Sequence, residues 1–144
     1  MNKSTVNSPD SVEVPVMTRL LEVAHRLEAR VEAALGAVGL SLAKFGVLKA
    51  LAEAGDSLPL SQLAQRIQCV RSNITQLVDR LEADGLVRRL DDPDDRRVVR
   101  AALTQAGRES FDEGVRIVAD QEQAVADALS QGDAAALHGA LGRL

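Results

Sequence analysis

Apolar side chains recur every three or four positions through most of the chain, the spacing that gives a helix one apolar face. The first such stripe covers residues 17–35, and the second covers residues 42–52, which Ser41 can cap. Thr104 and Ser130 can cap a long helix and a last helix in the same way. The pattern predicts long helices at both ends of the chain.

Two helices are expected close together in the middle. After a turn over residues 55–59, Ser61 can cap a short helix that ends near Ile67, which cannot be stable alone. The next helix carries apolar residues at i, i+3, i+4 and i+7 over residues 74–81, and Gly85 stands where a left-handed C-terminal cap is expected. This pair has the form of a helix-turn-helix.

The hydrophobic period then changes from about 3.6 to 2. Residues 86–90 and 98–103 flank the polar, turn-rich residues 91–97, which predicts a β-hairpin with a charged tip. A hairpin after a helix-turn-helix is a wing. The predicted fold is therefore mainly α with a small β-hairpin wing, a winged helix-turn-helix.

The polar face of the fourth helix is a candidate for DNA recognition. With the apolar stripe turned inward, the outward residues are Ser72, Asn73, Gln76, Asp79 and Arg80. Asn and Gln can pair with adenine through two hydrogen bonds, and Arg with guanine. The alternative is an ordinary solvated face, but such faces usually carry Glu and Lys rather than Asn, Gln and Ser.

Arginines mark the wing. Arg88 and Arg89 lie at its base, and Arg96 and Arg97 lie at its tip, where a cation can enter the narrow, negatively charged minor groove. The alternative is a turn held by its own Asp–Arg ion pairs. The two interpretations are compatible if Asp95 forms an ion pair with an arginine and thereby orients it toward the minor groove.

Charge is unevenly distributed along the chain. The net charge of −4 conceals 8 basic and 7 acidic residues over positions 61–100, against 3 and 7 over positions 101–144. Contacts with phosphates are therefore expected from the middle of the chain.

Composition excludes several classes. With two Phe and no Trp or Tyr, the chain lacks the aromatic platforms of single-stranded nucleic-acid modules. Cys69, His25 and His138 fall on separate elements, so we expect no metal, no cofactor and no enzyme. The chain shows no signal peptide and no membrane span, and we expect one cytoplasmic domain.

Four runs together resemble the MarR family of bacterial regulators. They are Leu-Ala-Gln-Arg-Ile at 63–67, the run from Ser72 to Arg89, Asp-Pro-Asp-Asp-Arg-Arg at 92–97, and Leu-Thr-Gln-Ala-Gly at 103–107. The resemblance implies a homodimer joined by its first and last helices, on a palindromic double-stranded operator. The recognition helices would enter successive major grooves and the wings the flanking minor grooves.

The resemblance also implies roles for single residues. The Asp-x-Arg of the family falls on Asp95 and Arg97, which makes Arg97 the minor-groove residue and Arg96 a phosphate contact. Gln68 stands where many relatives have Gly, and Val70 where they often have Ser or Thr. These departures weaken the assignment of Ser72 as a contact from the first turn.

The expected organisation is one domain, residues 1–144. A flexible arm covers about residues 1–14, dimerisation helices cover 15–40 and 105–144, and the winged helix-turn-helix covers 41–104. The expected function is sequence-specific DNA binding, with repression relieved by a small-molecule effector. A protein-interaction module without specific DNA binding is an alternative.

Two residues leave the mode of regulation open. Cys69 is either a small buried apolar side chain or a reactive thiol just before the recognition helix, which would make the protein a redox regulator. His25 either lines a ligand cleft or is an ordinary solvated histidine. The sequence favours the unreactive role for both residues.

Overall fold

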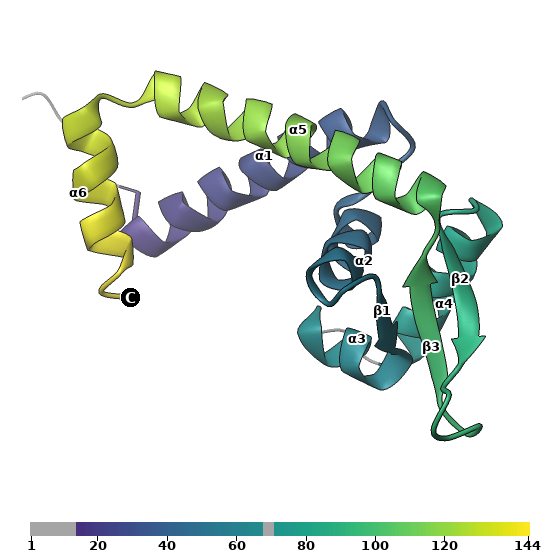
Figure 1. Ribbon diagram of the computed structural model, residues 1–144. Coiled ribbons are helices and arrows are strands. Elements are labelled where there is room, and N and C mark those ends of the chain that lie inside the picture. The colour runs from purple at the N-terminus through teal and green to yellow at the C-terminus, as the bar shows by residue number, and fades with distance from the viewer. Residues whose placement is uncertain (1–13, 68–70) are drawn as a thin grey trace, which may run out of the picture.

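The computed structural model describes residues 14–67 and 71–144, and for residues 71 and 72 it describes the backbone alone. It confirms the mainly α winged helix-turn-helix fold (Figure 1). The elements in chain order are α1 (Val16–Gly36), α2 (Leu42–Glu53), β1 (Ser57–Pro59), α3 (Leu60–Arg66), α4 (Arg71–Ala83), β2 (Val87–Asp91), β3 (Val99–Leu103), α5 (Gln105–Ala128) and α6 (Gln131–Leu141). We call α2 through β3 the winged body, and α1, α5 and α6 the helical extension.

Three helix starts carry the predicted side-chain caps. The Ser41 hydroxyl accepts the Lys44 N–H at 3.1 Å, and the Thr104 hydroxyl accepts the Gly107 N–H at 3.0 Å. Ser130 accepts the backbone N–H of Asp133 at 3.1 Å and donates its hydroxyl to the carboxylate of that residue. Each cap satisfies a backbone donor that has no partner inside the helix, so these helices begin where the sequence predicts.

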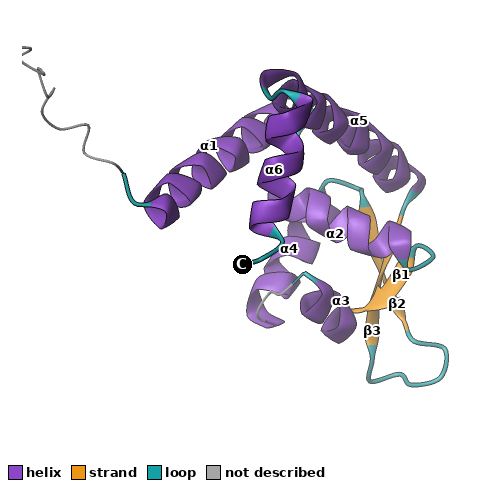
Figure 2. Ribbon diagram, turned by 90° about the vertical axis from the view of Figure 1, so that its left-hand side faces the viewer, coloured by secondary structure: helices purple, strands orange, loops and turns teal. Residues whose placement is uncertain are grey.

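An aliphatic core holds the winged body together. Figure 2 shows its three helices gathered beside the sheet. The largest fully buried side chains are Leu35, Val47, Leu48, Leu51, Leu63, Ile74, Val78, Leu81 and Val87. α4 supplies three of them from the stripe that the sequence predicted, so its opposite face points away from the core.

A third strand joins the predicted hairpin. β1 pairs antiparallel with β3, with Leu58 opposite Ala101, and the strand order is β1-β3-β2. β1 has only three residues and ends in Pro59, which has no N–H to donate. Alternation cannot be recognised over so short a segment, so the sequence predicted only a turn here.

The predicted cap of the third helix is wrong. α3 begins at Leu60, its N-cap position is Pro59, and no side chain caps it. Ser61 therefore lies inside the first turn and is exposed. Because Pro59 also ends β1, the chain passes from strand to helix without the intervening loop that a serine cap would need.

α5 lies close against the winged body because two of its residues have no side chain. A Cβ at Gly107 would overlap the backbone carbonyl oxygen of Leu86, and a Cβ at Gly114 would lie 2.6 Å from the ring of Phe45. Phe45 of α2 also stacks on Phe111 of α5, with ring centroids 5.8 Å apart. The two glycines are seven residues apart and so share one face of α5.

Thr104 connects the end of α4 to the start of α5. Its hydroxyl donates to the carbonyl of Gly85 at 2.6 Å, while its N–H donates to the carbonyl of Leu86 at 3.1 Å. Gly85 has a φ of 73°, the left-handed conformation that follows the end of α4. We call these contacts, together with the close approach of Gly107, the Thr104 joint.

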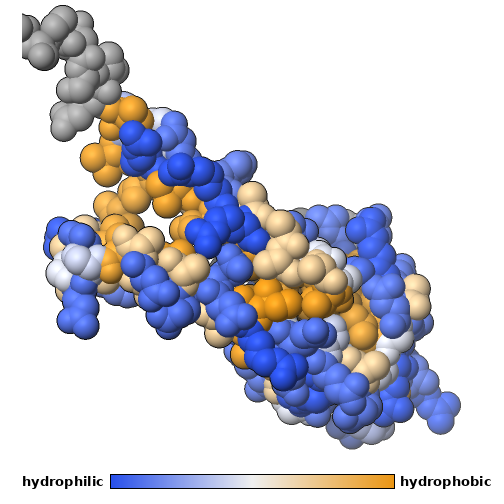
Figure 3. All heavy atoms as spheres, turned by 90° about the horizontal axis from the view of Figure 1, so that it is seen from above, coloured by the Kyte–Doolittle hydropathy of each residue, from blue (hydrophilic) through white to orange (hydrophobic). Residues whose placement is uncertain are grey.

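Apolar side chains remain uncovered at the far end of the helical extension. α6 has no buried residue. The exposed large apolar residues of α1 and the C-terminal segment are Val16, Met17, Leu21, Leu137, Leu141 and Leu144. Figure 3 shows apolar residues gathered around the opening at this end of the molecule. None of the described helices has the length and apolar character needed to cross a membrane.

Candidate nucleic-acid interface

α4 presents the candidate base-contacting side chains on its outer face. Asn73, Gln76 and Arg80 are all exposed, while Ile74 and Val78 between them are fully buried. Ser72 lies in the first turn of α4, but its side chain is outside the described part of the structure. The helix therefore presents one amide, then a second, then a guanidinium along one outward line, as the sequence predicted.

The wing is held by an arginine that the sequence did not single out. Arg100 on β3 donates to the Asp92 carboxylate at 3.0 Å and to the Ser57 hydroxyl of β1 at 3.0 Å. Asp92 in turn accepts the backbone N–H groups of Asp94 and Asp95. Hydrogen bonds from the Asp94 N–H and from Arg100 hold the pKa of Asp92 below its usual value. The wing turn is therefore fixed to the sheet by an ionised carboxylate.

Arg97 projects from this turn under the control of Asp95. Its Nε and Nη2 donate to the two carboxylate oxygens of Asp95 at 3.1 and 3.2 Å, yet its side chain is 90% exposed. Hydrogen bonds from the Arg97 side chain, and then from its N–H, lower the pKa of Asp95. Asp95 therefore stays ionised at neutral pH and orients a solvent-facing guanidinium, the combination that the sequence left open.

The other three wing arginines differ from one another. Arg96 and Arg88 are exposed and make no hydrogen bond or ion pair with any residue that the structure describes. Arg89 instead turns toward α4 and contacts Asp79 and Glu82. The signal for this was present in the sequence, because Arg89 follows the buried Val87 by two positions and so shares its face of the strand.

The outer face of α4 and the wing tip lie on the same side of the molecule. A polar hollow of about 210 Å³ separates them, and its lining includes Ser61 of α3, Thr75 of α4 and Arg97 of the wing. Thr75, which lies between Asn73 and Gln76 in sequence, thus borders the same hollow as the candidate minor-groove residue Arg97. Among the described residues, no group of three His, Cys, Asp or Glu side chains is placed to hold a metal ion.

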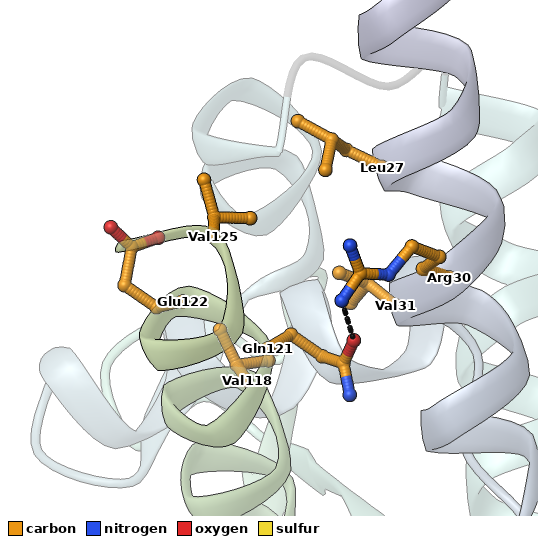
Figure 4. Close-up of a pocket in the computed structure, with 7 residues that line it drawn as sticks. All are labelled: Leu27, Arg30, Val31, Val118, Gln121, Glu122 and Val125. Carbon is orange, nitrogen blue, oxygen red and sulfur yellow. Dashed lines mark hydrogen bonds between the residues drawn. The ribbon is translucent and has the colours of Figure 1, made fainter. Parts of the chain in front are cut away.

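A small pocket lies between α1 and α5, inside the helical extension (Figure 4). Its volume is about 110 Å³, and Arg30 donates to Gln121 across it at 3.3 Å. The remaining lining residues are Leu27, Val31, Val118, Glu122 and Val125. Pockets for small organic ligands usually measure about 300–1,000 Å³. One chain alone therefore encloses too little space for an aromatic ligand at this place.

Both readings of His25 stay open, and Cys69 stays untested. The His25 side chain is 91% exposed and lies 3.9 Å from Glu28, as expected of a solvated histidine, but it also lines an open hollow of about 500 Å³ with Leu21, Glu22 and Arg26. Cys69 lies outside the described residues, as do Gln68 and Val70, so the thiol hypothesis and the expected change in turn geometry stay untested.

Proteins that resemble this chain are transcriptional regulators, which agrees with a DNA-binding surface on α4 and the wing. A model described as the MarR family matches residues 40–99. The HTH-type transcriptional regulator PrsX of Escherichia coli is 33% identical over 93 residues, which are 64% of this chain and 56% of PrsX. The HTH-type transcriptional repressor MdtR of Bacillus subtilis is 29% identical over 108 residues, which are 75% of this chain and 69% of MdtR. The match thus spans little more than half the length of PrsX.

Solved structures extend the likeness to nearly the whole chain. AbsC, a MarR family transcriptional regulator from Streptomyces coelicolor, superimposes with a TM-score of 0.78 at 28% identity, covering 93% of this chain and 92% of AbsC. A cysteine-to-serine variant of MarR from E. coli, complexed with operator DNA, superimposes with a TM-score of 0.77. Its identity of 23%, over 90% of this chain and 93% of that chain, shows the shared fold alone. Over residues 40–99, which hold most of the winged helix-turn-helix, the chain matches the MarR family.

Proposed function

We propose that this chain is a dimeric, sequence-specific DNA-binding repressor of transcription, and not an enzyme. One observation carries the proposal: α4 turns Asn73, Gln76 and Arg80 outward, and Thr75 of the same helix lines a hollow together with the exposed Arg97 of the wing. Hydrogen bonds to base edges in the major groove distinguish sequences, while a cation in the minor groove adds affinity. The name of MdtR, a transcriptional repressor, supports the direction of regulation.

The proposal includes a homodimer. Two copies related by a twofold axis would present two α4 helices to half-sites about 10 base pairs apart. The uncovered apolar side chains of α1 and α6 supply a surface for the second copy. The acidic C-terminal third of the chain suits a contact that lies away from DNA.

A small-molecule effector completes the proposed function. The pocket between α1 and α5 is too small in one chain for an aromatic ligand, so a second copy would have to enlarge a site at that place. Selection of bound fragments from genomic DNA tests the central claim, because it yields the operator and the genes beside it. Recovery of fragments without a common palindrome would contradict sequence-specific binding and favour the protein-interaction alternative.

Gln76→Ala is expected to weaken binding to the selected operator by about 1–3 kcal/mol and to leave binding to a scrambled duplex nearly unchanged. The amide of Gln76 is exposed on α4 and can pair with one base edge, which only the operator supplies. Asn73→Ala should have a smaller effect in the same direction. Fluorescence anisotropy titrations on both duplexes measure the difference.

The matched control is Gln123→Ala, which removes the amide of an exposed glutamine on α5 that hydrogen-bonds Asp127. It should change neither affinity. Equal losses on operator and scrambled duplex for Gln76→Ala would show that α4 does not distinguish sequence.

Arg97→Ala is expected to weaken binding to the operator and to the scrambled duplex alike. A minor-groove cation responds to electrostatic potential, which every duplex has. The slope of log affinity against log salt concentration should fall in magnitude by about 1, because one cation no longer displaces a counterion. Arg116→Ala removes the same charge from an exposed position on α5 and serves as the control. A loss confined to the operator would instead assign Arg97 a base-specific contact.

A further inference from the structure

The outer face of α4 carries two carboxylates beside its candidate base-contacting residues. Asp79 follows Gln76 by three positions, which places the two side chains roughly 60° apart around the helix axis. Glu82 lies one turn further along, and both acids are exposed, to 59% and 44% of their side-chain surface. A carboxylate at this place would face the phosphates of any duplex that α4 approaches, and like charges repel.

A single cation from the neighbouring strand contacts both acids. Nη2 of Arg89 lies 2.5 Å from Oδ1 of Asp79, and Nη1 lies 3.5 Å from Oε1 of Glu82. The Arg89 N–H also donates to Oε2 of Glu82 at 3.0 Å, and its guanidinium reaches the Thr75 carbonyl at 3.4 Å. Arg89 thus binds side chains and backbone of α4 along two turns of the helix.

Arg89 is the least exposed of the three charged side chains in this cluster. The Arg89 side chain is 28% exposed, less than either carboxylate that it contacts. It is therefore partly buried between β2 and α4, and its guanidinium is already engaged by α4. Arg88, its neighbour in sequence, is exposed and has no such partner among the described residues.

We propose that Arg89 is a positioning residue for DNA binding. It holds the Asp79 and Glu82 side chains toward β2 and cancels one of their two negative charges, so that α4 can approach the phosphates. Its contribution to affinity acts through the two acids and is independent of base sequence. The inference rests on the DNA binding proposed above.

The test is a double-mutant cycle on a random-sequence 25-base-pair duplex, with affinity measured by fluorescence anisotropy at low and moderate salt. Arg89→Met removes the cation and keeps most of the aliphatic stem. In the otherwise unmodified chain, it should weaken binding on the order of tenfold at low salt, and less at moderate salt because salt screens the exposed carboxylates. In a chain that carries Asp79→Asn and Glu82→Gln, the same substitution should change affinity less than twofold.

Arg88→Met supplies the matched control, because it removes an arginine from the same strand that has no ion pair in the described structure. Whatever its own effect, that effect should be equal in both backgrounds. The Asp79→Asn/Glu82→Gln variant with Arg89 intact adds a second measurement that does not depend on the folding of Arg89→Met. It should bind the random duplex more tightly than the unmodified chain at low salt.

Each outcome decides between explanations. An equal loss for Arg89→Met in both backgrounds would mean that Arg89 contacts phosphate directly or only fixes the position of β2, and it would overturn the inference. So would failure of Asp79→Asn/Glu82→Gln to tighten binding. An unmodified chain that binds no duplex at low salt would overturn the proposed function as well, which separates the two failures.

Discussion

Gly107→Ala is expected to lower the free energy of unfolding by about 3 kcal/mol or more, the upper end of the range for overpacked sites. The new Cβ would overlap the Leu86 carbonyl oxygen and lie 3.2 Å from Cδ2 of Leu103. That oxygen belongs to the backbone and already accepts the Thr104 N–H, so it cannot turn aside as the end of a flexible side chain can. α5 has to move away from the winged body, which breaks the Thr104 joint. Thermal and urea unfolding, followed by circular dichroism at fixed protein concentration, measure the loss.

Gly46→Ala is the control for this substitution. Gly46 lies inside α2, and a Cβ there meets nothing within 4 Å. Alanine favours a helix interior over glycine by roughly 0.5–1 kcal/mol, so this variant should be slightly more stable than the unmodified chain. If Gly107→Ala were equally harmless, the close seating of α5 on Leu86 would be wrong.

The double variant Leu137→Asp/Leu141→Asp is expected to sediment as a monomer, or to become insoluble, whereas the unmodified chain should sediment as a dimer at micromolar concentration. Both leucines are on α6, with 42% and 45% of their surface exposed. α6 has 11 residues, none of them buried, and an isolated helix of that length is marginally stable in water. In the proposed dimer, the second copy covers these leucines. Two carboxylates at these positions would have to be desolvated in the interface, at high cost.

A control variant, Gln131→Asp/Ala135→Asp, adds the same two charges to α6 at positions turned away from this leucine stripe. It should remain a dimer in sedimentation equilibrium. If the unmodified chain is a stable monomer at micromolar concentration, both the dimer and the proposed spacing of half-sites are wrong.

The sequence predicted those elements whose hydrophobic pattern is long enough to show a period. α4 was predicted because four apolar positions fix its buried stripe and Gly85 fixes its end, and the exposure of Asn73, Gln76 and Arg80 follows from that stripe. β1 has too few residues to show alternation. Its side chains acquire a role only through pairing with β3, more than 40 positions away.

The ion pairs of the interface were the least predictable part. Three arginines of the wing lie within five positions of one another, yet their contacts differ. Arg96 is exposed to solvent, Arg97 pairs with Asp95 inside the wing turn, and Arg100 connects Asp92 to Ser57 of β1. Which acidic residue each arginine contacts depends on how the strands pack against α4. The sequence separation between an arginine and an acidic residue does not reveal that packing. Arg89 is the case where strand alternation alone would have indicated the inward side of β2.

Because α5 is long and joined to the end of α4 at the Thr104 joint, a small tilt of α5 produces a large displacement of its far end. At 1.5 Å per residue, the 24 residues of α5 extend roughly 36 Å from the joint to the last turn. A tilt of about 5° at one end therefore displaces the other by about 3 Å over that length. The Thr104 hydroxyl caps α5 and also donates to the carbonyl of Gly85, just after α4, so such a tilt would act on α4. In the proposed dimer, a displacement of a few ångströms between the subunits would thereby become a small rotation of α4.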